Sequence, residues 1–391
     1  MGGVSPTQNP LRTQQFPAIL LLVAAGLGLL AANTPLHAPI AGVLDAHIAV
    51  PGTGIDLSVA HWISDGLLAI FFFVVAMELV YELTRGELNS MRRALQPAIA
   101  AAGGVIVPIA VYLFLAGGAE TAHGWPIPTA TDIAFALGVL AVFGKGLPSG
   151  VRIFLLALAI LDDIVGIVFI AILFAQDLNA IALGLGVLTT IAFGVLSRML
   201  GERRRPLVVT AMLILGVVTW GLIVSSGVHA TIAGVLLGLA MAQSPAMRTR
   251  FALEPWVNGA ILPVFAFSAA FVVVPQVSLG DLSPAFWAIT VALPLGKIIG
   301  IAGFGWIAMR IRPRGTPPAL VFPDLLAAGA LGGIGFTVSL LLANLAFATD
   351  AATRDQAILG VLAGSLIALM LCAALVSARA ASYRRRAEAS S

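Results

Sequence analysis

Residues 158–168 read Leu-Ala-Ile-Leu-Asp-Asp-Ile-Val-Gly-Ile-Val, which places two adjacent carboxylates, Asp162 and Asp163, inside an apolar run. Ionisable side chains in such a setting are costly and usually face a cavity or a partner. Neighbouring residues on a helix point about 100° apart, so the two carboxylates need two different partners. A structural ion pair would need only one of them, and the doublet therefore indicates a functional site.

The composition around this doublet is that of a membrane protein. The 391 residues are 60% hydrophobic and only 10% charged, whereas about 25% of residues are charged in soluble proteins. These values exclude a soluble fold, and we expect an all-α polytopic membrane protein that contacts the lipid bilayer. The single cysteine, Cys372, excludes both a disulfide framework and a cysteine-based metal site.

Twelve stretches are long and apolar enough to cross the bilayer, which takes about 20 residues each. They begin near Phe16, Trp62, Leu95, Pro126, Ser149, Ala180, Pro206, Val228, Trp256, Ala285, Asp324 and Gln356. Nearly all Lys and Arg residues fall in alternate loops; Arg354 and Lys297 are the exceptions. This bias predicts that both termini are cytoplasmic. The net charge of +3 then reflects topology, and we expect no nucleic-acid partner.

The longest expected outer loop lies between the first and second spans. Apolar residues alternate there on both sides of residues 51–54, Pro-Gly-Thr-Gly. The alternation predicts a small β-hairpin, and an ordinary loop is the alternative.

Four further ionisable residues fall within the expected spans. Asp132 lies in the fourth span, Lys297 in the tenth, and Asp65 and Glu78 near the two ends of the second. Asp65 and Glu78 are candidates for cation access or pH modulation, but a structural salt bridge or a position at the membrane interface is the alternative.

Lys297 is the only cation within a span, and it can pair with one carboxylate of the doublet. The other carboxylate is then left to bind a cation from solution, with hydroxyls and backbone carbonyls completing the shell. Carboxylates also bind protons. The sequence thus predicts a site where a small cation and protons compete.

Two of the expected spans are interrupted. The fourth opens with residues 125–132, Trp-Pro-Ile-Pro-Thr-Ala-Thr-Asp, and the eleventh carries four glycines within residues 329–335. Broken backbone at membrane depth is tolerated only where it lines a cavity or is buried in protein. Asp132 and Lys297 can offset the partial charges of the half-helix ends. Glycine-mediated helix packing is the alternative for the eleventh span.

The interrupted spans occupy equivalent places in two triplets, spans three to five and spans ten to twelve. The triplets begin seven spans apart, so their orientations in the membrane are opposite. This arrangement predicts an inverted-topology repeat with the two broken helices crossing at a site near the middle of the membrane.

Several separated motifs, in order along the chain, closely resemble the NhaA family of sodium/proton antiporters. They are Thr131-Asp132-Ile-Ala-Phe-Ala-Leu-Gly, Leu161-Asp162-Asp163-Ile, Ser226-Gly227-Val-His229-Ala-Thr231-Ile-Ala-Gly, residues 263–267, Gly296-Lys297 and Gly333-Ile-Gly335-Phe336-Thr337. The resemblance extends from about the first span to the last.

The resemblance implies electrogenic exchange of cytoplasmic Na⁺ or Li⁺ for external protons by alternating access, with roles in pH and sodium homeostasis. The positions matching Asp162 and Asp163 form the cation and proton site, and Lys297 pairs with the first aspartate. Thr131 and Asp132 lie at the helix crossing, with Thr337 as a further supporting residue. No cofactor is implied.

The resemblance also implies an organisation and a location. We expect a single transporter domain with a core bundle from about 95–175 and 285–380, scaffold helices from about 16–82 and 180–274, and short cytoplasmic tails at 1–15 and 381–391. The implied location is the bacterial inner membrane, as a homodimer joined partly through the hairpin.

The chain departs from the family pattern where pH response is concerned. Residues 79–82, after Glu78, are Leu-Val-Tyr-Glu where family members typically carry basic residues, and residues 250–256 are Arg-Phe-Ala-Leu-Glu-Pro-Trp. The pH profile therefore cannot be carried over. Glu254 and His229 remain candidate modulators, His229 because its ordinary pKa is about 6.5; helix packing is the alternative for His229.

Three rival functions can be weighed. A sodium-coupled symporter of an organic anion could share the architecture, but it must hold both ligands together rather than let them compete. An intramembrane aspartyl protease would need a Gly-x-Gly-Asp signature, which the sequence lacks. A channel must not hold its ion in a tightly paired charge cluster. We therefore expect a transporter and not an enzyme.

Overall fold

The computed structural model describes residues 15–52, 55–118, 120–175, 177–200, 206–311 and 320–390. Most of the expected N-terminal tail lies outside the described residues. The same is true of part of the turn of the expected hairpin, Thr53 and Gly54, and of several basic loop residues, namely Arg12, Arg203, Arg204, Arg205, Arg312 and Arg314.

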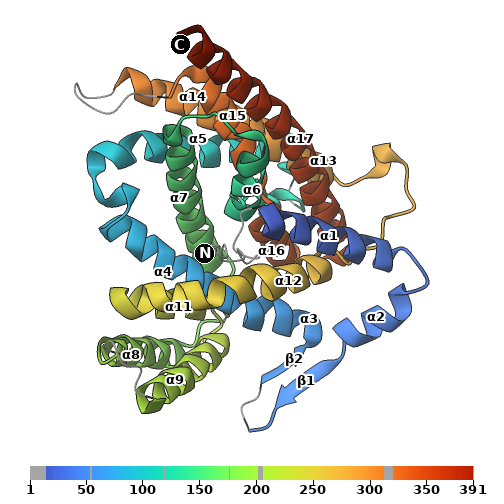
Figure 1. The fold of residues 1–391 in the computed structure, drawn as a ribbon. Coiled ribbons are helices and arrows are strands. Elements are labelled where there is room, and N and C mark those ends of the chain that lie inside the picture. Colours follow the sequence, from blue (N-terminus) through green and yellow to red (C-terminus); the bar gives the residue numbers. More distant parts are fainter. Residues whose placement is uncertain are drawn as a thin grey trace, which may run out of the picture.

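The described chain is mostly helical (Figure 1). Its first nine α-helices are α1 (Gln15–Ala32), α2 (His37–Leu44), α3 (Val59–His61), α4 (Leu68–Thr84), α5 (Met91–Ala116), α6 (Ile133–Phe143), α7 (Ser149–Leu173), α8 (Ala180–Arg198) and α9 (Pro206–Ser225). The others are α10 (Thr231–Ala240), α11 (Gln243–Trp256), α12 (Leu262–Ala269), α13 (Pro284–Val291), α14 (Lys297–Arg310), α15 (Phe322–Gly332), α16 (Phe336–Ala346) and α17 (Ala351–Ser390).

The predicted β-hairpin is confirmed. Strands β1 (His47–Val50) and β2 (Ile55–Ser58) pair antiparallel, with Ile48 opposite Leu57. The Trp62 side chain, just beyond β2, donates a hydrogen bond to the Ile48 carbonyl at 3.1 Å and stacks on Trp220 of α9. These contacts hold the hairpin against the helices.

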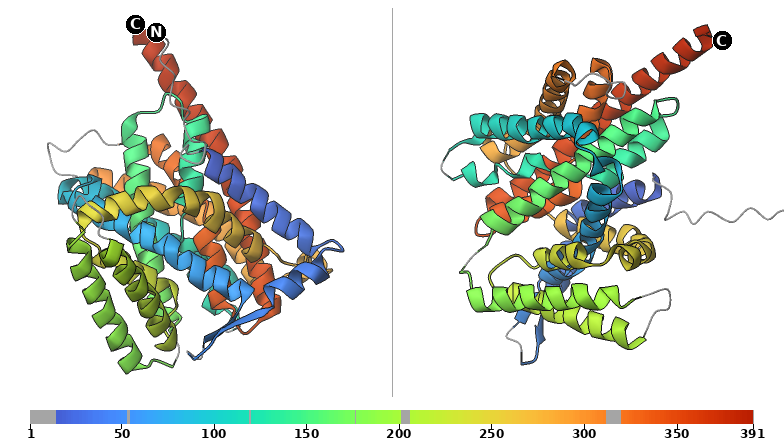
Figure 2. Two further views of the ribbon diagram at one scale, coloured as in Figure 1. Left: turned by 60° about the horizontal axis from the view of Figure 1, so that its bottom comes forward. Right: turned by 90° about the vertical axis from the view of Figure 1, so that its left-hand side faces the viewer.

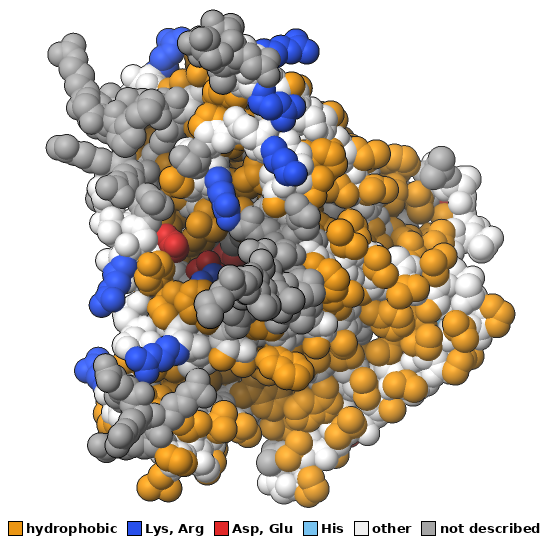
Figure 3. All heavy atoms as spheres, viewed as in Figure 1, with side chains coloured by type: hydrophobic (Ala, Val, Ile, Leu, Met, Phe, Trp, Pro, Cys, Tyr) orange, Lys and Arg blue, Asp and Glu red, His pale blue; other side chains and the backbone are white. Residues whose placement is uncertain are grey.

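Eight helical segments of the described chain are long and apolar enough to cross a membrane, or ten if each of two bent helix pairs counts as one span. The bent pairs are α1 with α2, at 112°, and α15 with α16, at 51°. Hydrophobic side chains cover much of the surface, and the Lys and Arg side chains in the same view gather on its upper and left sides (Figure 3). This distribution suits a protein surrounded by lipid.

Two segments differ from the expected boundaries. The span expected to begin near Trp256 belongs to a helical segment that starts at Gln243, and the last helix starts at Ala351 and continues to Ser390 through the expected cytoplasmic tail. Figure 2 shows the end of α17 projecting beyond the other helices. Apolar length marks only the part of a helix that suits lipid, so it misses polar helical extensions.

Three long segments contain a π-helical stretch. These are η2 (Trp62–Leu67) before α4, η6 (Val257–Ile261) before α12, and η8 (Ala292–Gly296) between α13 and α14. A π-helical stretch inserts an extra residue and re-aims the side chains that follow, which is why such stretches are frequent at functional sites. Here η8 contains Pro294 and ends directly before Lys297.

Helices α5 and α14 pack with their backbones in close approach. A Cβ added at Gly103 would collide with the carbonyl oxygen of Gly300, and one added at Gly300 would collide with the carbonyl oxygen of Gly103. Only glycine fits at both positions. This contact fixes α14, and with it Lys297, against the rest of the bundle.

We expect Gly300→Ala to destabilise the protein by about 1–3 kcal/mol, because the added methyl group forces the two backbones apart. Gly303→Ala is the matched control on the same helix, since a Cβ there meets nothing within 4 Å. Thermal unfolding of the detergent-purified variants measures the difference. Equal melting temperatures for the two variants would contradict the assigned contact.

Candidate functional site

The site forms where two interrupted helical segments meet. One interruption is the stretch between the 3₁₀ turn η5 (Ile127–Thr129) and α6, and the other is residues 333–335 between α15 and α16. The backbone N–H of Asp132 donates to the Ile334 carbonyl at 2.6 Å, and the Ser339 hydroxyl donates to the Ile127 carbonyl at 2.7 Å. The two breaks thus satisfy part of each other's backbone hydrogen bonding.

The Asp132 carboxylate accepts hydrogen bonds at the N-termini of two half-helices, α6 and α16. One oxygen accepts from the backbone N–H of Phe135 at 3.2 Å, which makes Asp132 the N-cap of α6. The other accepts from the backbone N–H of Thr337 at 3.2 Å and from its hydroxyl at 2.8 Å, in the first turn of α16. A buried carboxylate here offsets the positive partial charge of both helix ends.

Lys297 is fully buried, and its three ammonium donors each have an acceptor. Nζ lies 2.6 Å from Asp162 Oδ2, 2.5 Å from the Thr129 carbonyl oxygen and 3.1 Å from Thr131 Oγ1. Thr129 ends η5, so Lys297 also meets the negative partial charge at the C-terminal end of a helical turn. Lys297 has no further donor to offer.

Thr131 links this ion pair to the second break. Its hydroxyl oxygen lies 2.7 Å from Asp162 Oδ2 and 2.9 Å from the carbonyl oxygen of Gly332, the last residue of α15. A hydroxyl carries one proton, so it donates to one of these acceptors at a time. The other carboxylate oxygen of Asp162, Oδ1, is buried and has no hydrogen-bond partner among the described residues.

Asp163 differs from its neighbour. Its side chain is partly exposed, and it forms no hydrogen bond or ion pair with the described part of the chain. Asp132, Asp162, Glu78 and Lys297 all lie within electrostatic range of it. The two consecutive carboxylates therefore differ in their contacts: Asp162 forms an ion pair with Lys297, whereas Asp163 has no such partner among the described residues.

The local backbone explains why Lys297 reaches the crossing. Gly296 packs against Pro108 of α5, where an added Cβ would lie 2.8 Å from the proline Cα. Close packing of η8 on α5 therefore brings the start of α14 inward. In the second break, a Cβ on Gly335 would lie 2.7 Å from a Leu293 methyl carbon, so the crossing also needs a residue without a side chain there.

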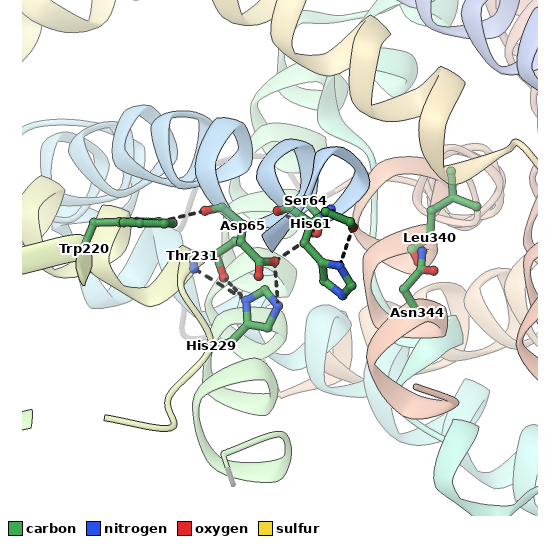
Figure 4. Close-up of polar contacts among 9 residues, drawn as sticks. His61, Ser64, Asp65, Trp220, His229, Thr231, Leu340 and Asn344 are labelled. Carbon is green, nitrogen blue, oxygen red and sulfur yellow. Dashed lines mark hydrogen bonds and ion pairs between the residues drawn. The ribbon is translucent and has the colours of Figure 1, made fainter. Parts of the chain in front are cut away.

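The sequence-predicted residues Asp65 and His229 meet each other but not the aspartate pair. His229 Nε2 lies 3.4 Å from Asp65 Oδ1, and its Nδ1 lies 2.9 Å from the Thr231 hydroxyl (Figure 4). The Ser64 hydroxyl donates to the Asp65 carboxylate. The Trp220 indole N–H donates to the backbone carbonyl of Asp65. This polar group connects η2 with the start of α10.

Glu78 and Glu254 belong to a third group. Arg250 Nη2 of α11 lies 2.8 Å from Glu78 Oε1 of α4, and Glu254 lies within electrostatic range of Glu78. Sequence reasoning missed Arg250 as the partner of Glu78. It also missed Thr129 and Ser339, although the polar character of the first break was a signal for Thr129.

A resident metal site is not evident among the described residues, where no three His, Cys, Asp or Glu side chains are grouped to hold an ion. Within the described chain, the oxygen atoms left without a hydrogen-bond partner at the crossing are those of the Asp163 carboxylate and Oδ1 of Asp162.

An apolar helical bundle, interrupted helices that meet inside it and a buried charge cluster at their meeting point define a secondary ion transporter. The comparisons with known proteins agree with this class. The sequence profile of the family described as Na⁺/H⁺ antiporter 1 matches residues 8–376. The chain belongs to this Na⁺/H⁺ antiporter family.

Curated relatives cover nearly the whole chain. The Na⁺/H⁺ antiporter NhaA 2 of Clavibacter michiganensis is 50% identical over 382 residues, 96% of this chain and 93% of that protein. The NhaA antiporter of Tropheryma whipplei is 43% identical over 373 residues, 94% of each chain. NhaA 3 of Streptomyces coelicolor is 42% identical over 388 residues, 96% of this chain and 81% of that protein.

Membership confirms the predicted resemblance and makes the protein a membrane transporter rather than an enzyme. The transported ions are substrates, and the family requires no cofactor.

We expect Lys297→Met to destabilise the protein by about 3–5 kcal/mol, because it leaves the Asp162 carboxylate buried without its cation. The double variant Lys297→Met, Asp162→Leu removes both charges and should recover much of that loss. Arg310→Met, an exposed change on the same helix, is the control. Thermal unfolding in detergent measures all three, and a Lys297→Met protein as stable as the control would contradict the pairing.

Proposed function

We propose that this protein exchanges cytoplasmic Na⁺ or Li⁺ for external protons, electrogenically, and that Asp162 and Asp163 form the shared cation and proton site. The observation that carries the proposal is the difference between the two aspartates. Lys297 binds Asp162 with all three of its donors occupied, while Asp163 has no partner among the described residues.

This arrangement supports competition between the two substrates. A cation at Asp163 would use its carboxylate, the free Oδ1 of Asp162, and water or backbone oxygens. A proton on the same carboxylate removes the charge that attracts the cation. The loaded forms therefore exclude each other, as antiport requires.

The two carboxylates also support electrogenic exchange. Asp162 and Asp163 can bind one proton each, whereas the cation that binds at Asp163 is a single ion. An exchange of unequal numbers of protons and cations moves net charge across the membrane. Lys297 contributes by forming an ion pair with Asp162 when no proton is bound there, which holds this carboxylate in place.

Alternating access would operate at the crossing. We propose twelve spans, which are reached when α10 and the segment formed by η5 and α6 are added to the ten counted with the bent pairs. The inverted repeat then comprises α5 to α7 and α13 to α17. Because Asp132 and Lys297 compensate the half-helix ends, the breaks can line a cavity without leaving uncompensated charge.

The remaining expectations from the sequence belong to the same proposal. The core bundle comprises residues of about 95–175 and 285–380, and the other helices form the scaffold. The protein lies in the bacterial inner membrane with both termini in the cytoplasm, as a homodimer. It contributes to pH and sodium homeostasis. Asp65, Glu78, His229 and Glu254 act on cation access or pH response.

The test uses everted membrane vesicles with an imposed acidic interior. Addition of Na⁺ or Li⁺ should dissipate the pH gradient, and Asp163→Asn should abolish this response because the amide keeps the shape but not the charge. Asp281→Asn, an exposed change, should exchange like the wild type. Normal exchange by Asp163→Asn would refute the site, and absence of exchange by the wild type at any pH would refute the function.

Competition has a signature in the pH dependence. As the pH falls, protons occupy the shared carboxylates, so the apparent KM for Na⁺ should rise while the maximal rate at saturating Na⁺ changes less. Initial rates in proteoliposomes, measured over a range of Na⁺ concentrations at several pH values, provide the check. A KM independent of pH would mean that Na⁺ and protons bind at separate groups.

A further inference from the structure

Asp324 is a buried carboxylate that the proposed exchange does not use. It lies in the first turn of α15, with 1% of its surface exposed. Oδ1 accepts from Arg379 Nε at 2.8 Å, and Oδ2 accepts from the Tyr383 hydroxyl at 2.7 Å and from the backbone N–H of Val321 at 3.3 Å. The N-terminus of α15 favours a negative charge at this position.

Both side-chain partners come from the last part of α17. The guanidinium of Arg379 also lies over the ring of Tyr383, 4.9 Å from its centroid. One turn of α17 therefore supplies an ion pair and a hydroxyl to a single carboxylate 55 residues or more away in sequence. We refer to Asp324, Arg379 and Tyr383 as the α17 clamp.

The same part of α17 also reaches the far end of α6. Arg384 Nη1 donates to the carbonyl oxygen of Lys145 at 2.9 Å, in the loop that follows α6. Helices α6 and α15 each have one end at the crossing, α6 at Asp132 and α15 at Gly332. The end of α17 thus contacts the opposite ends of both half-helices.

Helix α15 connects the clamp directly to the candidate site. It has 11 residues, from Phe322 to Gly332, and its last carbonyl accepts the Thr131 hydroxyl, which also contacts Asp162 and Lys297. A helix of this length is a stiff connection between its ends. A shift of α15 at Asp324 would therefore displace the Gly332 carbonyl and change which acceptor Thr131 uses.

We propose that Asp324, Arg379 and Tyr383 are positioning residues for ion exchange: the α17 clamp fixes α15 so that Gly332, Thr131 and the pair of Asp162 with Lys297 keep the geometry that binds the cation. This role rests on the proposed function of the aspartate site. It predicts that damage to the clamp weakens apparent cation affinity although no clamp residue contacts the site.

The experiment measures KM and kcat for Na⁺ in proteoliposomes containing Asp324→Asn, Arg379→Gln, the double variant and Tyr383→Phe. Each single change should raise KM by about threefold to thirtyfold, the range that remote substitutions produce when they alter coupling. The double variant should resemble the worse single variant, because both changes break one pair. Tyr383→Phe should give the smallest rise.

Arg354→Gln is the matched control. Arg354 also pairs with an aspartate on α17, Asp355 at 3.4 Å, but near the other end of the helix and about one-third exposed. It should leave KM and kcat unchanged. If Asp324→Asn does not fold, the KM of Tyr383→Phe tests the positioning role instead, because this change removes one hydroxyl and keeps the ring.

The outcomes are distinct. A raised KM with non-additive single variants supports the positioning role. Folded variants with wild-type KM, or a loss of thermal stability without a change in KM, would overturn it and leave the clamp as a stability element. A wild-type protein that does not exchange Na⁺ for protons in the same proteoliposomes would overturn the proposed function and, with it, this inference.

Discussion

Broken backbone inside an apolar bundle must have its polar groups compensated from within the protein, and this constraint organises the structure. The hydrocarbon of the bilayer offers no hydrogen-bond partners, so the free N–H groups, carbonyls and helix ends at the breaks must be compensated by the protein or by a cavity that it lines. Asp132 accepts from the first turns of α6 and α16, and Lys297 donates to the carbonyl that ends η5. Two charges of opposite sign therefore make two breaks tolerable at one point.

The chemistry of the site follows from this compensation. The three N–H donors of Lys297 bind Asp162, Thr129 and Thr131. None is left to form a hydrogen bond with Asp163. Asp163, which has no partner among the described residues, therefore lies beside a paired carboxylate, and the proposed binding of a cation or a proton at Asp163 rests on this difference. The residues that stabilise the breaks therefore lie directly beside the carboxylates of the proposed ion site.

Packing far from the crossing determines how well this geometry is kept. The close approach of Gly103 and Gly300 places α14, and the contact of Gly296 with Pro108 places Lys297. At the other side, Asp324 joins α15 to the end of α17. Helices α14 and α15 connect these contacts to the crossing, and the proposed positioning role of the α17 clamp rests on that connection.

The sequence by itself determined the class of the fold and the candidate residues of the site. Apolar length, the alternation around residues 51–54 and charges within apolar runs are all local signals. The sequence therefore predicted the hairpin, both interruptions and the residues Asp132, Asp162, Asp163 and Lys297. Only the tertiary structure decided which groups meet: Lys297 with the carbonyl of Thr129, Arg250 with Glu78, and Asp324 with Arg379 and Tyr383. These partners lie tens to hundreds of residues apart, and their contact depends on how the helices pack, which no local pattern records.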